Sequence, residues 1–227
     1  MAGSPDADRL RIDNDYRYAI LLIVATILTF AASGQGWLGR LASVCIAGFT
    51  LLVLLHMSDA ARRTRRIAGV AVAGALALTI VSEVGHTDSG HAFQLAVGVL
   101  LAFAGPVVIV NKLARRRRID LTTISGSLCV YLLAGLAFAF MFALIDVVEA
   151  GPFFVQTDTV ESVDFVYFSF TTLATLGYGD LTAVGDYGRL LSVTEALLGQ
   201  LYLVSVVALV VSNVEWKRRG PDGRATP

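Results

Sequence analysis

Six long runs of apolar residues, separated by short polar or basic segments, limit what this chain can fold into. Their approximate ranges are residues 18–33, 37–57, 67–84, 92–110, 121–145 and 187–213. Each run is near the ~20 residues that an α-helix needs to cross a bilayer. Because lipid offers no partners to unpaired backbone groups, the runs predict an all-α integral membrane protein with six transmembrane helices.

The composition agrees with a membrane protein. Of the 227 residues, 56% are hydrophobic and only 16% are charged, with a mean hydropathy of +0.69, whereas soluble domains carry about 25% charged residues. The formal net charge is zero, so the overall balance predicts no nucleic-acid partner. Ala31, Ala32 and Ser33 would also suit a cleaved signal peptide, but the segment before the first run is as acidic as it is basic.

The basic residues predict the orientation of the six helices. Sixteen of the 18 lysines and arginines lie in the N-terminal segment, in the loops after the second and fourth runs, or after Asn213. Only Arg40 and Arg189 fall on the other side. The positive-inside rule therefore predicts that both termini are cytoplasmic. We expect the protein itself to lie in the plasma membrane.

The apolar runs and the loops between them divide the chain into segments. We expect a cytoplasmic tail over residues 1–17, a four-helix membrane domain over 18–111, a basic linker over 112–120, a pore-forming domain over 121–213 and a second cytoplasmic tail over 214–227. Within the pore-forming domain, we expect an outer helix over 121–146, a short helix over 162–174, a loop over 175–180 and an inner helix over 187–213.

The segment between the fifth and sixth runs is not a simple loop. Residues 162–174 are apolar and aromatic but too short to span a bilayer, which predicts a re-entrant helix whose start Asp158, Thr159 or Ser162 could cap. Non-helical backbone at membrane depth is tolerated only where protein buries it or where it lines a water-filled cavity. The residues after the short helix should therefore be buried or line such a cavity.

The stretch directly after the short helix is Thr175-Leu176-Gly177-Tyr178-Gly179-Asp180. A dehydrated cation needs oxygen ligands, and a row of backbone carbonyls supplies them without fixed charge. Aiming successive carbonyls at one axis requires positive φ at some positions, which glycine adopts without a Cβ clash. In a soluble protein the same letters would indicate an ordinary turn. The short helix before them favours a cation path.

Residues 172–180, T-L-A-T-L-G-Y-G-D, resemble the selectivity-filter signature of tetrameric potassium channels. The resemblance covers about residues 121–213. It implies that K⁺ binds at Thr175, Leu176, Gly177, Tyr178 and Gly179, and that Asp180, Tyr167 and Phe168 support the filter. The signature usually has valine at Leu176, and many members have a second threonine at Ala174 and tryptophans at Tyr167 and Phe168. These departures leave the expected ion class unchanged.

The resemblance also gives expectations for the last run. It implies a gating hinge at Gly199, 22 residues after Gly177, although close helix packing is an alternative reason for this glycine. If Gln200 faces the pore, helical spacing brings Leu203, Val207 and Val211 onto the same apolar lining. Glu195, an ionisable residue at membrane depth, is expected behind the filter, hydrogen-bonded to the short helix or to a neighbouring subunit.

The first four runs resemble a voltage-sensor domain without its charges, because residues 92–110 contain no arginine. We therefore expect no steep voltage gating. Two arginine clusters lie at the cytoplasmic boundary and either anchor the topology or bind anionic lipids. They consist of Arg62, Arg63, Arg65, Arg66, Arg115, Arg116, Arg117 and Arg118.

These patterns together predict a potassium-selective channel that assembles as a homotetramer, with K⁺ as the permeant ion, no cofactor and no enzymatic activity. A secondary cation transporter is an alternative, although it would normally have paired interrupted helices, and the sequence has one interrupted segment. A non-conducting regulatory subunit that retains a pore-like loop is another.

Overall fold

The computed structural model describes residues 5–33, 37–57, 62–85, 88–114, 121–149, 151–157 and 159–219. These residues form seven helices and no strand beyond one isolated bridge, so the all-α prediction is confirmed. The helices are α1 (Pro5–Ala31), α2 (Trp37–Met57), α3 (Arg62–Gly85), α4 (Asp88–Ala114), α5 (Leu121–Val148), α6 (Ser162–Leu173) and α7 (Asp186–Arg219).

Two helix ends differ from the predicted segments. Helix α1 begins at Pro5, so most of the segment expected as a polar tail continues helically into the first apolar run. Helix α7 continues to Arg219, six residues beyond the last apolar run. Both ends extend helices into polar sequence, where hydropathy alone does not indicate secondary structure.

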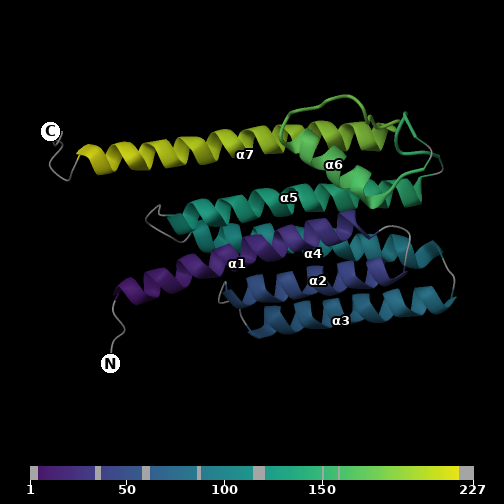
Figure 1. Ribbon diagram of the computed structural model, residues 1–227, viewed down its shortest axis with the longest axis horizontal. Helices are drawn as coiled ribbons and strands as arrows, with labels where there is room; N and C mark the ends of the chain where they lie inside the picture. Colours follow the sequence, from purple (N-terminus) through teal and green to yellow (C-terminus); the bar gives the residue numbers. More distant parts are fainter. Residues whose placement is uncertain are drawn as a thin grey trace.

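Helix α5 is the centre of the molecule (Figure 1). The bundle of α1–α4 packs against one side of α5, mainly through α4 and α1, and α6 and α7 pack against the other side. This arrangement reflects the composition of α5, which is apolar on every face and must be covered all round. From Leu136 to Phe140, five consecutive side chains are buried, so no face of this part of α5 is open.

Helix α7 is covered much less. Only 11% of its most apolar 18-residue window, within Asp186–Ala208, is buried. Its exposed large apolar side chains are Tyr187, Leu190, Val193, Leu197, Leu198, Leu201, Leu203, Val204 and Val207. An apolar surface of this extent on a single chain indicates contact with lipid or with other protein chains.

Two helical segments of the described residues are long and apolar enough to cross a membrane, Thr123–Val148 and Asp186–Ala208. The described parts of α1–α4 contain shorter apolar stretches, within Tyr18–Ala31, Leu41–His56, Ala68–Val81 and Leu95–Val107. The six predicted runs therefore correspond to six long helices, two of which are membrane-capable by length and composition.

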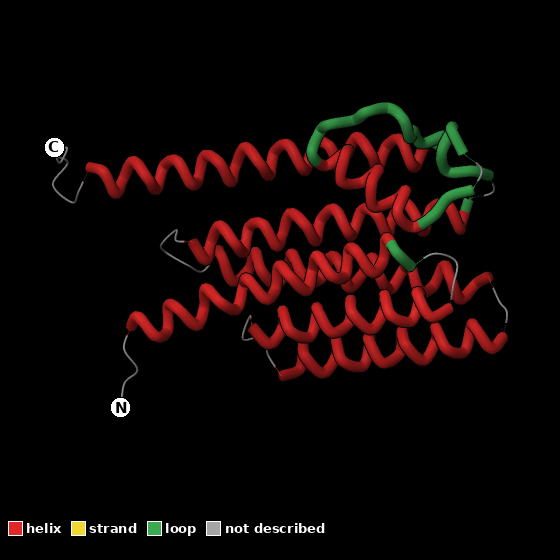
Figure 2. The backbone as a smooth tube through the Cα atoms, viewed as in Figure 1, coloured by secondary structure: helices red, strands yellow, loops and turns green. Residues whose placement is uncertain are grey.

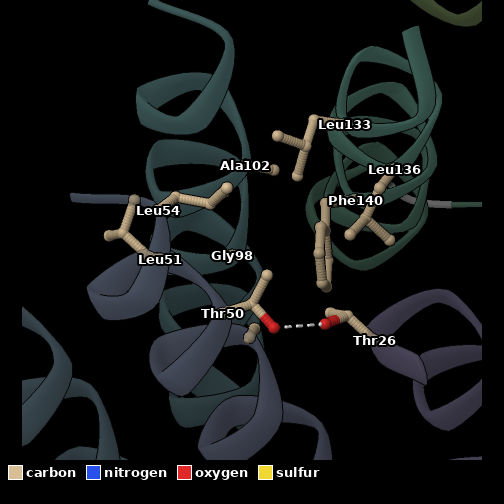
Figure 3. A pocket seen from close by; sticks show the side chains of 10 residues that line it. Thr26, Thr50, Leu51, Leu54, Gly98, Ala102, Leu133, Leu136 and Phe140 are labelled. Carbon is tan, nitrogen blue, oxygen red and sulfur yellow. Dashed lines mark hydrogen bonds between the residues drawn. The ribbon is translucent and has the colours of Figure 1, made fainter. Parts of the chain in front are cut away.

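A small cavity lies where α1, α2, α4 and α5 meet (Figure 3). Its volume is about 20 Å³, and its lining is apolar except for a hydroxyl pair, Thr26 Oγ1 and Thr50 Oγ1, 2.9 Å apart. This volume corresponds to about one water molecule. The cavity is therefore too small to be an ion path.

Candidate ion-conducting site

The segment around α6 enters and leaves the bundle at the same end (Figure 2). Phe154, before α6, forms an antiparallel bridge with Ala183, after it. The amide of Val155 donates to Thr182 O at 3.0 Å, and the amide of Val184 donates to Phe153 O at 2.9 Å. Between these points α6 runs inward along α5 and α7, and the chain returns as an irregular loop.

The first turn of α6 is capped differently from the prediction. The N-cap residue is Glu161, and its amide donates to Asp164 Oδ2 at 2.9 Å. Of the residues expected in this role, Thr159 and Ser162 are not the cap, and Asp158 lies outside the described residues. A glutamate is a weak N-cap by propensity, but an acidic residue in the first turn also interacts favourably with the helix dipole.

The last turn of α6 leads directly into the loop. The carbonyl of Thr171 accepts from two amides, those of Leu176 at 2.8 Å and Gly177 at 3.2 Å. The amide of Thr175 donates to Thr172 O at 2.9 Å. These bonds turn the amides of the loop towards the helix, so the loop's carbonyls are left to point elsewhere.

The backbone from Thr175 to Gly179 alternates in conformation. Thr175, Gly177 and Gly179 have φ of 57°, 48° and 78°, whereas Leu176 and Tyr178 do not have positive φ. A β-branched residue with positive φ is a genuine outlier, and such strain clusters at functional sites. Reversal of φ at every second residue lets consecutive carbonyls of an extended segment face one side, whereas in a regular strand they point alternately to its two edges.

The carbonyls of residues 175–179 accept no hydrogen bond from any other part of the described chain. All five residues are exposed, and a Cβ built on Gly177 or Gly179 would have no neighbour within 4 Å. A row of backbone oxygens without protein partners needs another partner. Water or a cation in an open space beside the loop would satisfy them.

Two tyrosines pack together at the Asp180 end of this loop. Tyr167 of α6 donates its hydroxyl proton to Asp180 Oδ2 at 2.6 Å, and its ring stacks on that of Tyr178 with centroids 6.5 Å apart. This bond requires the neutral phenol, because the Asp180 carboxylate can only accept the proton that Tyr167 donates.

Replacing Tyr167 by phenylalanine should weaken the outer end of the loop while leaving the ring stack. We expect currents that decline several-fold faster during sustained opening, because Asp180 then loses the hydrogen bond that ties it to α6. Single-channel recording in planar bilayers measures this decline. Tyr18→Phe is the matched control, since Tyr18 is exposed on α1 far from the loop in sequence. Equal decline in both variants would contradict the role of the Tyr167 hydroxyl.

Phe168, expected to support the filter, belongs to an aromatic cluster formed with α5 and the segment before α6. Its ring centroid lies 5.0 Å from Phe142 of α5, 5.2 Å from Phe154 and 6.1 Å from Phe153. The cluster joins the start of α6 to α5 and to the loop before α6. The support that Phe168 gives is therefore to the helix rather than to the loop carbonyls.

Glu195 lies on the face of α7 that packs against α6, with no exposed surface. Its Oε1 is 2.5 Å from Ser169 Oγ, and the same Ser169 Oγ is 2.7 Å from Gly135 O of α5. The expected hydrogen bond between Glu195 and the short helix is thus present. It connects three helices just behind the loop.

Gly199 lies one turn further along the same face of α7. A Cβ at this position would overlap Leu173 O and would be 2.9 Å from Leu173 Cδ1, at the end of α6. Of the two reasons considered for this glycine, the structure provides close packing: no larger residue fits without moving α7 away from α6. The role of Gly199 as a hinge stays a prediction.

The other expected pore-lining residues are exposed where the structure describes their side chains. Gln200, Leu203 and Val207 are exposed on α7, and the side chain of Val211 lies outside the described part of the structure. Of the basic residues considered for lipid binding, Arg62 and Arg66 are exposed. The side chains of Arg63 and Arg65 are not described, and Arg115, Arg116, Arg117 and Arg118 lie outside the described residues.

Sequence reasoning missed several residues of the site. Thr171 O accepts from the loop, Ser169 bonds to Glu195, and Gly135 O accepts from Ser169. None of the three stands out, because serine, threonine and glycine are common in membrane helices. Gln156 and Thr182 were also missed. Gln156 Nε2 donates to Thr182 Oγ1, and the Thr182 amide donates to Gln156 Oε1, both at 2.9 Å, which fastens the exit of the loop.

Comparison with known proteins gives a family match that includes this region. Residues 126–215 match a family model described as "Ion channel", a range that covers most of α5, all of α6, the loop and most of α7. No match was found among curated proteins. The match supports an ion-channel family for this part of the chain and, with the apolar helices, a membrane location for the protein.

Proposed function

We propose that this protein is a potassium-selective channel subunit in which the carbonyls of Thr175, Leu176, Gly177 and Tyr178 coordinate the permeant ion. The observation that carries the proposal is the alternation of φ along residues 175–179 together with carbonyls that have no partner in the described chain. Carbonyl rings replace the hydration shell of an alkali cation without a net charge that would hold it too tightly.

The surroundings of the loop favour a cation over an anion. The C-terminal end of α6 carries partial negative charge and ends at the inner side of the loop. At the outer side, Asp180 follows the loop directly, and Glu149, Glu161, Asp164 and Asp186 lie in the segments around it. Negative charge at a mouth raises the local concentration of cations.

A single loop cannot enclose an axis, so we propose a homotetramer with four loops around one pore. Two features support assembly. The glycines of the loop face open space in one chain, and α7 leaves most of its apolar surface uncovered. Neighbouring copies would cover part of α7, and its exposed residues Gln200, Leu203 and Val207 would line the inner cavity.

The remaining expectations form part of the same proposal. Each subunit would cross the plasma membrane six times, with α6 as a re-entrant helix and both termini in the cytoplasm. Helices α1–α4 would not act as a steep voltage sensor, because α4 carries no regular series of arginines. Exposed Arg62 and Arg66 would contact anionic lipid headgroups at the start of α3.

The purified protein in proteoliposomes should transport K⁺ passively and at least about tenfold faster than Na⁺, since a fixed ring of carbonyls discriminates by the energy of dehydration. Radiotracer or fluorescent flux measurements, with K⁺ and Na⁺ gradients exchanged, test this expectation. Native mass spectrometry tests the tetramer. Transport driven uphill by a second ion would favour a transporter, and tetramers without flux under any condition would favour a regulatory subunit.

A further inference from the structure

The contact between Glu195, Ser169 and Gly135 contains one hydrogen too few if Glu195 is ionised. Ser169 Oγ lies within hydrogen-bond distance of two oxygens, Gly135 O at 2.7 Å and Glu195 Oε1 at 2.5 Å. The serine hydroxyl has one proton, and neither a peptide carbonyl nor a carboxylate can donate. A protonated Glu195 supplies the second hydrogen, so that both short contacts are hydrogen bonds.

The surroundings of Glu195 favour the same protonation state. Its side chain has no exposed surface, and its Oε2 has no hydrogen-bond partner within the described residues. The nearest arginine in sequence, Arg189, donates its Nε–H to Ala183 O at the outer end of α7. A buried carboxylate with one donor and no cation would be costly, whereas a neutral carboxyl leaves only one weak acceptor unmatched.

The end of α6 adds to this preference. The carbonyl of Leu173, in the last turn of α6, faces the backbone of α7 at Gly199, one turn beyond Glu195. Carbonyls at a helix C-terminus carry partial negative charge and disfavour a nearby anion. A path for cations does not require an ionised Glu195 behind it, because the partial negative charge that attracts the cation comes from the carbonyls.

We propose that Glu195 carries a proton and acts as a positioning residue for the filter, donating to Ser169 Oγ while Ser169 donates to Gly135 O. This chain of two bonds connects α7, α6 and α5 behind the filter. Ser169 lies one turn before Leu173, so the bonds hold the depth and rotation of the last turn of α6, from which the loop starts. The effect on K⁺ flux rests on the proposed channel function, whereas the proton on Glu195 is inferred from the hydrogen-bond geometry alone.

Infrared spectroscopy of the full-length protein tests the proton directly. The parent protein at neutral pH should give a protonated-carboxyl C=O stretching band that is absent from Glu195→Gln in the difference spectrum. A difference spectrum that contains carboxylate bands instead would overturn the proposal. This measurement does not depend on flux, so a parent protein that fails to conduct would count against the channel assignment and not against the proton.

Flux through variants tests the positioning role. Glutamine keeps a neutral donor of the same length, so Glu195→Gln should retain K⁺ flux and K⁺/Na⁺ selectivity, whereas Glu195→Ala and Ser169→Ala should each reduce K⁺ flux about tenfold because they leave buried polar groups unmatched. The double variant Glu195→Gln/Ser169→Ala should lose the K⁺ flux that Glu195→Gln alone retains, because the glutamine then has no hydroxyl to donate to.

Ser192→Ala is the matched control on α7, because within the described residues the Ser192 hydroxyl bonds only its own helix, at Gly188 O, 2.7 Å away. It should behave as the parent. Tetramer content by native mass spectrometry separates assembly defects from filter defects. Glu195→Gln that loses flux as Glu195→Ala does, or that remains active when Ser169→Ala is added, would contradict the proposal.

Discussion

Replacing Gly177 by alanine should abolish potassium-selective flux. Gly177 has φ of 48°, a conformation that costs a residue with a Cβ roughly 1–2 kcal/mol. Four chains would multiply this cost around one axis, so it exceeds the ~1.4 kcal/mol that corresponds to a tenfold change. Relief of the strain would rotate the peptide units on both sides of residue 177 and remove their carbonyls from the axis. Flux of K⁺ and Na⁺ into proteoliposomes measures the loss.

Gly151→Ala separates backbone strain from the loss of the ion path. Gly151 has φ of 130° and open space around its Cα, but it lies in the loop before α6. This variant should lower the midpoint of thermal unfolding slightly and keep selective flux. If both variants retained selective flux, residues 175–179 would not be the filter. If both lost it equally, general destabilisation would explain the result.

Replacing Gly199 by alanine should separate α7 from the end of α6. The new Cβ would overlap Leu173 O, a backbone atom that cannot rotate away. Accommodating a methyl group in a packed interface costs typically about 1–3 kcal/mol, and here it displaces the turn from which the filter starts. We expect reduced thermal stability of the protein in detergent and reduced K⁺ flux.

Gly74→Ala is the matched control in another helix. Gly74 lies in α3, and a Cβ there would have no neighbour within 4 Å. Alanine has the higher helix propensity by about 1 kcal/mol, so this variant should be neutral or slightly stabilising. A Gly199→Ala protein as stable as Gly74→Ala would rule out the close approach. If Gly199 is instead a hinge, Gly199→Ala should change gating and leave the thermal stability unchanged.

Much of the helical framework could be predicted from hydropathy and loop chemistry. The run 121–145 corresponds to α5, and the short segment from Ser162 ends at Leu173, one residue before the predicted end. These elements depend on local sequence. The length of an apolar run, and the glycine, proline or charged residues that bound it, determine the helix within a few residues of each end. That Glu195 needs a polar partner could also be predicted, because a buried acid is costly without one; the sequence left open whether α6 or a neighbouring subunit supplies it, and the structure shows α6.

Other features depend on contacts between distant residues. The partner of Glu195 could have been any hydroxyl on α6, and only the packing of three helices selects Ser169 together with Gly135 O. The positive φ of Thr175 could not be inferred from residue type, because threonine disfavours that conformation. The choice between packing and hinge at Gly199 required the position of Leu173 O.

The enclosure of α5 by helices of its own chain has a consequence for biosynthesis. A newly made copy can bury α5 against α1 and α4 without waiting for a neighbour, so this stage is independent of protein concentration. In the proposed tetramer, α7 and the loop after α6 would keep their open surfaces until other copies bind, and that stage would obey mass action. At low expression the membrane would then hold folded protomers that do not conduct, and K⁺ flux would rise more steeply than the amount of protein.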